Sequence, residues 1–419
     1  MASSLDRFPP EIFCIIFEHL WAHEIVSAFH NINVHLNRIL ASYNGYLVNL
    51  KSIRKSYFDL ITRCIRPEQI IGLILSDERD TPYQSQLFQS YFSIEECVHL
   101  RTLKFLHLDD DGQSFFTDLP ELEHLKSFQI DVKIMLPLVT IPLSVERLVI
   151  NIRPNFIFDV DPSISMIAYE RLRYLSVCHC SCEQLKKILA QAVQLTSLKV
   201  VLPLLTDEEF DTFINFHRKQ IRVSPLISLS LSVSGAGHTI MQTHLEQFLA
   251  PWKDLRRLEL ITKAYGQSQL TDGIEWERFV LRYLPRLSKF DFNFSCRQID
   301  PNVINAYRRP FWIDRHWYVL YETHRSVLYT VPRFVPSSVH PSCHPISPNC
   351  TTLPIEQHSI FYDAVNELRV DSKRYELPFR YTHVQTLTLD GVFANDIVSL
   401  FAMFDHLRSM LFNGHSTRL

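Results

Sequence analysis

A short hydrophobic frame, with apolar residues at its first, fourth and sixth positions, returns along most of the chain. Alternate side chains of a strand point to the same face, so the last two apolar positions of a frame would enter a core together. Each frame therefore predicts a short strand. The nine frames of the first series begin at Ile70, Leu100, Leu125, Val145, Leu172, Leu195, Leu226, Leu255 and Leu287, and later frames begin at Val365, Val384 and Leu407.

The segments between the frames have the spacing of amphipathic helices, for example over 182–195, 207–221, 243–252 and 274–284. A strand followed by a helix, repeated, predicts parallel strands, because each helix returns the chain to the same edge of the sheet. The nine frames recur at intervals of 20 to 32 residues, with a mean of about 27. Leucine-rich repeats have this frame and nearly this period.

We therefore predict an α/β fold in which residues 67–419 form a leucine-rich-repeat solenoid. Its parallel strands would line the concave face of a horseshoe, with the helices outside. The alternative is an ordinary α/β domain with alternating strands and helices. The sequence ends soon after its last frame, which predicts either an atypical cap there or a fragment of a longer chain.

Residues 295–364 interrupt the period and predict an irregular insertion. Residues 316–334 alternate in a way that predicts two strands around Glu322–Arg325, and the proline-rich segment 335–354 predicts an exposed loop. Insertions into solenoids often lie on the binding face. The aromatic residues here are expected to form a satellite core rather than an interface, although both uses remain open; they are Tyr307, Phe311, Trp312, Trp317, Tyr318, Tyr321, Tyr329 and Phe334.

The first forty residues differ from the rest of the chain. Pro9 and Pro10 suit the first turn of a helix. Apolar residues then follow at helical spacing, namely Ile12, Phe13, Ile16, Phe17 and Leu20. We predict further short helices at about 24–29 and 34–41, and a connecting helix with a basic face over 46–66.

A core built from so few residues is small, and the first forty residues contain more large side chains than it can hold. Some of Ile15, Phe17, Trp21 and Phe29 should therefore face another protein. An N-terminal helical cap on the larger domain is the simpler interpretation.

The residues Phe8-Pro9-Pro10-Glu11-Ile12, then Ile16-Phe17, Leu20 and Glu24-Ile25, resemble an F-box. The sequence departs from that motif at Phe8, where leucine is usual. With the repeats that come after it, the chain is similar to F-box proteins with C-terminal leucine-rich repeats. The resemblance implies that residues 1–45 are an F-box-like module and that the chain is a substrate receptor of a Skp–cullin–F-box ubiquitin ligase.

By this resemblance, the helical module would bind a Skp-type adaptor, and through it a cullin scaffold, while the repeats would bind an unknown protein substrate. The expected adaptor contacts are Phe8, Pro9, Ile12, Ile16, Leu20 and Ile25. The role would be non-catalytic. The alternative is a leucine-rich-repeat interaction scaffold with no ligase role.

Composition is that of a folded globular protein, with 46% hydrophobic and 21% charged residues. A net charge of −3 and no strongly basic tract predict no nucleic-acid partner. No apolar run approaches the ~20 residues that cross a bilayer, so we expect no membrane partner. The nine cysteines are scattered and odd in number, and no signal-peptide pattern precedes them, which predicts an intracellular protein, cytoplasmic or nuclear.

Candidate chemistry is sparse. The run 178–182 is rich in cysteine, but Cys180 falls at the Asn/Cys position of its repeat, where a small buried side chain is expected. His340, Cys343, His344 and Cys350 match no common zinc spacing, and Asp109–Asp111 lacks the rest of a calcium loop. Nucleotide-binding and hydrolase motifs do not occur. We expect no metal, no cofactor and no catalytic residue.

Overall fold

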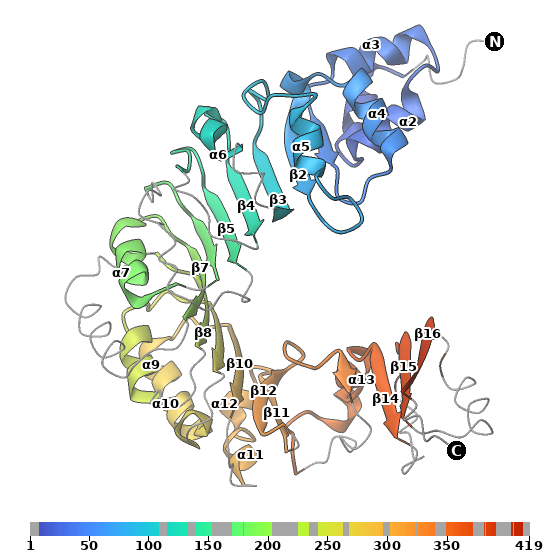
Figure 1. Cartoon of the computed structure of the whole chain (residues 1–419). Coiled ribbons are helices and arrows are strands. Elements are labelled where there is room, and N and C mark those ends of the chain that lie inside the picture. Colours follow the sequence, from blue (N-terminus) through green and yellow to red (C-terminus); the bar gives the residue numbers. More distant parts are fainter. Residues whose placement is uncertain are drawn as a thin grey trace. The chain divides into compact units, whose positions relative to one another are not determined.

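The structure, a computed structural model, is a mixed α/β fold with mostly parallel strands (Figure 1). It divides into two compact units: unit 1 is Met1–Val201 with Gln220–Leu226, and unit 2 is Leu202–Lys219 with Ile227–Leu419. The residues that the structure describes are 8–108, 115–132, 140–152, 170–178, 180–202, 225–233, 242–262, 268–295, 302–323, 325–339, 349–371, 381, 383–390, 404 and 406–413.

Unit 1 begins with the helices α1 (Pro10–Phe17), α2 (Ala22–Phe29) and α3 (Val34–Ser42). Helices lie at the three predicted positions, but a separate three-helix module is not clearly seen. Pro9 and Pro10 start α1 as expected, and the Asn33 side chain caps α3 by accepting a hydrogen bond from Leu36 N at 2.7 Å. The Glu24 carboxylate accepts a hydrogen bond from Trp21 N at 2.8 Å, which holds the start of α2.

A strand comes after these helices where a helix was expected. β1 (Tyr46–Asn49) is parallel to β2 (Ile70–Ser76), and α4 (Lys55–Cys64) begins only after it. The predicted helix over 46–66 is therefore wrong for its first part. Tyr46 and Val48 alternate into the core, and this period-two burial of a short segment beside β2 outweighs its helical pattern.

The first helices share their core with the next elements of the chain, because α2 contacts β1 and α4 as well as α3. The buried amide of Gln69 donates to the backbone oxygens of Leu40, Ala41 and Tyr43 at 3.3, 3.1 and 2.8 Å. The end of α3 is thus held to the residue that leads into β2.

The frames of unit 1 lie on parallel strands that follow one another in sequence order. Equivalent positions pair in register: Leu73 with Leu103, Leu103 with Phe128, and Phe128 with Leu148. The parallel strands predicted from the frames are confirmed. After β2 come β3 (Thr102–Leu108), β4 (Ser127–Val132), β5 (Arg147–Ile152), β6 (Tyr174–Val177) and β7 (Ser197–Leu202), with α5 (Gln84–Gln89), α6 (Phe115–Asp118) and α7 (Cys182–Gln191) between them.

Helix α7 has a reciprocal cap at its start. Ser181 Oγ accepts from Gln184 N at 3.2 Å, and Gln184 Oε1 accepts from Ser181 N at 2.9 Å. We expect Ser181→Ala to lower the free energy of unfolding by about 0.5–2 kcal/mol, measured by urea denaturation. Ser56→Ala, on the exposed face of α4, is the matched control and should change it by less than about 0.5 kcal/mol. Equal effects of the two substitutions would contradict the capping role.

Unit 2 repeats the arrangement. Its parallel strands β8 (Ser228–Val233), β9 (Arg257–Thr262) and β10 (Lys289–Ser295) pair Leu229 with Leu258 and Leu258 with Phe290. Figure 1 shows α9 (Gln242–Leu249) and α10 (Gly273–Tyr283) on one side of these strands. No helix among the described residues covers the other side, which we call the open face. The predicted helix over 207–221 lies outside the described residues.

The hairpin predicted around Glu322–Arg325 is confirmed. β11 (Tyr318–Glu322) and β12 (Val327–Val331) are antiparallel, and β12 is also antiparallel to β10. Before the hairpin, α11 (Val303–Ala306) and α12 (Pro310–Ile313) contribute to an aromatic core around Trp312. Six of the eight aromatic residues named for this region are buried, as expected, while Tyr321 and Phe334 are half-buried.

The prediction of an exposed loop over 335–354 is wrong for the described residues at the end of this segment. Thr351, Thr352 and Leu353 are buried. Thr352 Oγ1 accepts from Val319 N at 2.9 Å, and Thr351 Oγ1 donates to Val319 O at 2.9 Å. These bonds hold the segment against β11, whereas 340–348 lie outside the described residues.

The last frames lie on a second parallel sheet. Its strands β13 (Ser338–Val339), β14 (Glu367–Asp371), β15 (Thr386–Asp390) and β16 (Ser409–Asn413) again pair in sequence order, with α13 (Ser359–Asp363) before β14. Leu368 pairs with Leu387, and both belong to a core that also contains Tyr318 and Tyr329 of the hairpin. The hairpin thus joins two runs of parallel strands within unit 2.

Candidate functional site

A group of exposed apolar residues lies on α1 and just before it. Phe8, Ile12, Ile15 and Ile16 are 48%, 41%, 54% and 40% exposed, and we call these four residues the α1 patch. Ile12, Ile15 and Ile16 follow helical spacing, so they share one face of α1. Contiguous exposed apolar residues of this size commonly mark interaction sites.

The α1 patch is not needed to close the core, because the other face of α1 already does so. Phe13 and Phe17 are buried, and the Phe17 ring centroid lies 5.3 Å from that of Phe29 and 5.2 Å from that of Tyr43. α1 is therefore apolar on two sides. One side stabilises the fold, and the other remains exposed.

The expected adaptor contacts separate into two groups. Phe8, Pro9, Ile12 and Ile16 are exposed, and Leu20 is half-buried. Ile25, by contrast, is fully buried, and it lies on α2, a helix that contacts β1 and α4. Ile25 is therefore a core residue and is not available to a partner.

Some exposed residues at this end were not among the expected contacts. Some of Ile15, Phe17, Trp21 and Phe29 were expected to face another protein, and of these Ile15 and Trp21 are exposed. Ile32 and Val34 were missed altogether, although they are 47% and 67% exposed. They flank the first turn of α3, where His35 Nε2 lies 3.4 Å from Phe8 O. This contact joins the turn to the start of α1, and no sequence spacing signals it.

Acidic side chains border the α1 patch. Glu11 and Glu18 are exposed on α1. Burial raises the pKa of the neighbouring Cys14 thiol, and the two carboxylates raise it further. Cys14 therefore stays a neutral thiol at physiological pH, and the surface can act by apolar contact rather than by thiolate chemistry.

The open face of unit 2 is polar, and several of its charged side chains are paired. Ser230 Oγ donates to Glu259 Oε1, and Arg333 Nε donates to Glu259 Oε2, both at 2.6 Å. Lys289 Nζ lies 3.4 Å from Asp291 Oδ2. Burial raises the pKa of the Asp291 carboxyl, although Lys289 acts in the opposite direction. The hydrogen bond to Glu259 raises the pKa of Arg333.

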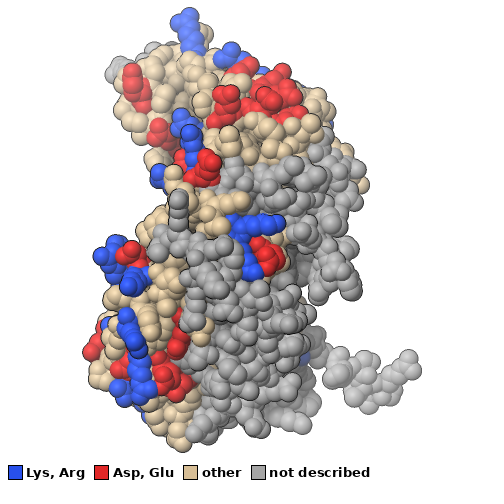
Figure 2. Space-filling model, turned by 90° about the vertical axis from the view of Figure 1, so that its left-hand side faces the viewer, with Lys and Arg blue, Asp and Glu red and all other residues tan. Residues whose placement is uncertain are grey.

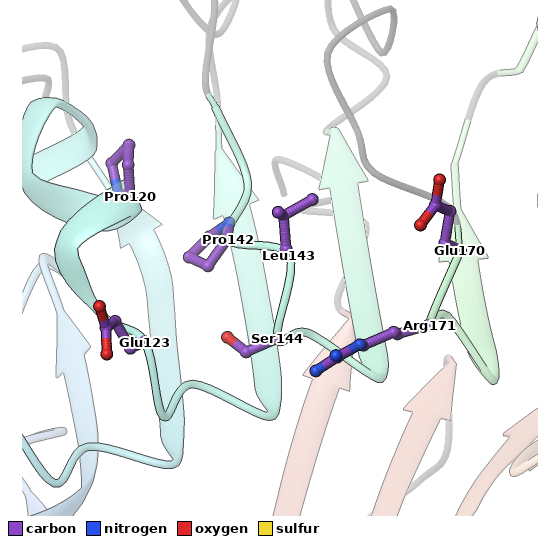
Figure 3. A pocket seen from close by; sticks show the side chains of 7 residues that line it. All are labelled: Pro120, Glu123, Pro142, Leu143, Ser144, Glu170 and Arg171. Carbon is purple, nitrogen blue, oxygen red and sulfur yellow. The ribbon is translucent and has the colours of Figure 1, made fainter.

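A surface pocket of about 350 Å³ lies in unit 1 (Figure 3). Figure 3 shows Glu123, Ser144 and Arg171 on successive turns. Ser144 Oγ donates to Leu125 O at 2.9 Å, so this hydroxyl is engaged by the backbone. The pocket offers carboxylates and one guanidinium beside the exposed Leu143, and its described lining contains no histidine or cysteine. The lining therefore offers no nucleophile paired with a histidine.

The cysteine-rich run is structural where it can be described. Cys180 is fully buried, its N–H donates to Val201 O at 2.9 Å, and burial raises the pKa of its thiol to about 12. The expected small buried side chain at this position is confirmed. Among the described residues, no group of three or more His, Cys, Asp or Glu could hold a metal ion. His340, Cys343, His344 and Asp109–Asp111 lie outside the described residues.

Charged side chains of both signs are mixed on the face drawn in Figure 2. Across the described part of the chain, no helix combines the length and apolar content needed to cross a membrane. No protein-family model matches the sequence, and no curated protein matches it either.

Proposed function

We propose that the chain is the substrate-recognition subunit of a Skp–cullin–F-box type E3 ubiquitin ligase. The α1 patch would bind a Skp-type adaptor, and through it a cullin scaffold, while the parallel strands form a leucine-rich-repeat solenoid that binds a target protein. The observation that carries the proposal is the second apolar face of α1, exposed where the F-box motif has its apolar residues.

Burial of the α1 patch would contribute substantial binding energy. Complete burial of an isoleucine side chain is worth about 1.5–3 kcal/mol, and the patch contains three partly exposed isoleucines and Phe8. A surface of this kind is costly to leave in water. A partner that covers the patch would remove this cost.

Strand order supports the repeat interpretation over an ordinary α/β domain. A doubly wound sheet reverses its strand order at a switch point. Here the parallel strands within each unit follow the sequence order, and equivalent frame positions pair with one another. This nearest-neighbour pairing is typical of solenoids.

The subunit would act by position and not by covalent chemistry. Holding a target close to a ubiquitin-conjugating enzyme raises the local concentration of its lysines and orients them. The chain itself would need no catalytic residue for this role.

A leucine-rich-repeat scaffold without a ligase role is the second candidate, and one observation favours it. The first helices share their core with β1 and α4, as a cap on the repeats would. Removal of residues 1–45 cannot separate the two candidates, because it would leave the buried Gln69 amide without its acceptors in either case. Surface substitutions are needed instead.

The decisive experiment tests whether a Skp-type adaptor co-purifies with the wild-type chain and with an Ile12→Asp/Ile16→Asp variant. Both side chains are exposed, so the variant should fold, whereas two carboxylates would be buried in the proposed contact. We expect adaptor binding to weaken at least about 100-fold, as measured by titration calorimetry.

Leu281→Asp is the control, because Leu281 is also exposed, at 55%, but lies on α10 of unit 2. It should bind the adaptor as the wild type does. Absence of adaptor binding by a well-folded wild type would refute the ligase role and leave the scaffold.

A further inference from the structure

A cavity of about 420 Å³ opens on the open face of unit 2, where the parallel strands meet the hairpin. Neighbouring strands contribute paired positions to it: Ile261 of β9 pairs with Asn293 of β10, and Ser295 of β10 pairs with Val327 of β12. Its volume lies within the range of about 300–1,000 Å³ that is typical of ligand pockets.

One wall of the cavity can form hydrogen bonds. Asn293 and Ser295 are half-exposed on the same face of β10, with Asp291 two residues earlier. The carboxamide of Asn293 has N–H donors and a carbonyl acceptor, and the hydroxyl of Ser295 can both donate and accept a hydrogen bond. This combination matches the alternating N–H and C=O groups of a peptide backbone.

Apolar side chains flank these polar positions on both neighbouring strands. Val327 and Phe334 are half-buried and line the cavity from β12 and the segment after it, and Ile261 lines it from β9, beside Asn293. Both Val327 and Phe334 pack against the core that the hairpin shares with the second parallel sheet. These side chains are therefore held in place before any ligand binds.

The charged groups at the cavity already have partners of opposite sign. Glu322 and Arg325 lie 3.2 Å apart, and Arg325 Nη2 also donates to Ser338 O at 3.5 Å. Next to the cavity, Arg333 donates to Glu259 at 2.6 Å. Because each arginine faces a glutamate, the site does not favour a ligand of either charge.

We propose that this cavity binds an extended peptide segment of the target protein through one bulky uncharged side chain. The side chain would lie between Ile261, Val327 and Phe334, and the flanking backbone would bond to Asn293 and Ser295. The inference deepens the proposed function, since it rests on the assignment of target binding to the repeats. It does not depend on the adaptor.

The test uses the full-length protein and a phage-displayed library of random linear peptides. We expect the selected peptides to share a bulky apolar residue. For a synthetic peptide from the selection, Asn293→Ala should weaken binding about five- to tenfold, the usual effect of one lost hydrogen bond. Ser295→Trp should abolish binding by filling the cavity.

Ser228→Trp is the matched control. It makes the same substitution on the open face of unit 2, but on β8, where Ser228 pairs with Arg257 and does not line the cavity. It should leave peptide binding unchanged. No enrichment over the Ser295→Trp protein would overturn the inference. Enrichment of acidic peptides that inorganic phosphate displaces would overturn it too, in favour of an anion site at Arg325.

Adaptor binding separates this inference from the proposed function. Both cavity variants should co-purify with the adaptor as the wild type does, since the α1 patch is unchanged. A protein that binds the adaptor but selects no peptide would keep the receptor role and refute the cavity. A protein that selects peptides but binds no adaptor would keep the cavity and leave the scaffold.

Discussion

Ile25→Asp is expected to destabilise unit 1 by at least about 4 kcal/mol. Ile25 is fully buried on α2, which contacts β1 and α4. The substitution removes most of a core side chain and places an unpaired carboxylate among apolar groups, and each change alone costs a few kcal/mol. Since domains are stable by only about 5–15 kcal/mol, the substitution should remove a large share of the stability of unit 1. Urea denaturation followed by circular dichroism measures the effect.

Ile12→Asp is the informative comparison, because the F-box resemblance gives both isoleucines the same role. Ile12 is exposed, so its substitution should shift the unfolding free energy by less than about 1 kcal/mol. Both variants should lose adaptor binding, but only Ile25→Asp through unfolding. A stable Ile25→Asp protein would show that α2 does not pack against β1 and α4 through this side chain.

Trp312→Ala is expected to lower the stability of unit 2 by about 3–5 kcal/mol. The indole is fully buried, with its ring centroid 4.6 Å from that of Tyr307 and 5.2 Å from that of Phe311. Its Nε1 donates to Gly273 O at 3.3 Å. Removing it leaves a large cavity and takes one hydrogen bond from Gly273 O at the start of α10. The shift of the denaturation midpoint, with the slope unchanged, measures the loss.

Trp21→Ala is the control for this substitution. Trp21 is exposed, and the bond that it makes to Glu24 comes from its backbone N–H, which alanine retains. Its effect on stability should be within about 1 kcal/mol. If both tryptophan variants lost equal stability, the aromatic residues around Trp312 would not form a core that stabilises unit 2.

The strands of the repeats could be predicted because one physical requirement repeats along the chain. In every frame from Ile70 to Phe292 the three apolar positions are at most 6% exposed, so the pattern reports burial directly. The hairpin of β11 and β12 could be predicted from its β-branched and aromatic residues, although its burial does not alternate: Tyr318, Val319 and Leu320 are all buried, as are the last four residues of β12.

The predictions failed where contacts with residues distant in the sequence determine the local structure. Tyr46 and Val48 form a strand because β2 lies beside them, and β2 is more than twenty residues away in sequence. Thr351 and Thr352 are buried because β11 offers Val319 as a hydrogen-bond partner. Local composition, rich in proline and serine nearby, carries no information about that partner.

The candidate site was predictable as a surface but not residue by residue. Ile12 and Ile25 occupy equivalent roles in a motif, yet only Ile12 is exposed. Helical spacing identifies two apolar faces on α1, but which face enters the core depends on the positions of Phe29 and Tyr43. The cavity of unit 2 is lined by residues of four strands, β9, β10, β11 and β12, that no sequence motif connects.

The in-register pairing of the frames has a consequence for how such a chain can change over evolution. Phe128 and Leu148 are 20 residues apart and Leu258 and Phe290 are 32 residues apart, yet both pairs occupy equivalent positions on adjacent strands. The length of chain between strands is therefore nearly free to vary. A deletion of one residue inside a frame, by contrast, would turn its apolar side chains to the opposite face. Insertions and deletions in descendants of this sequence should accumulate between the strands and be eliminated within them.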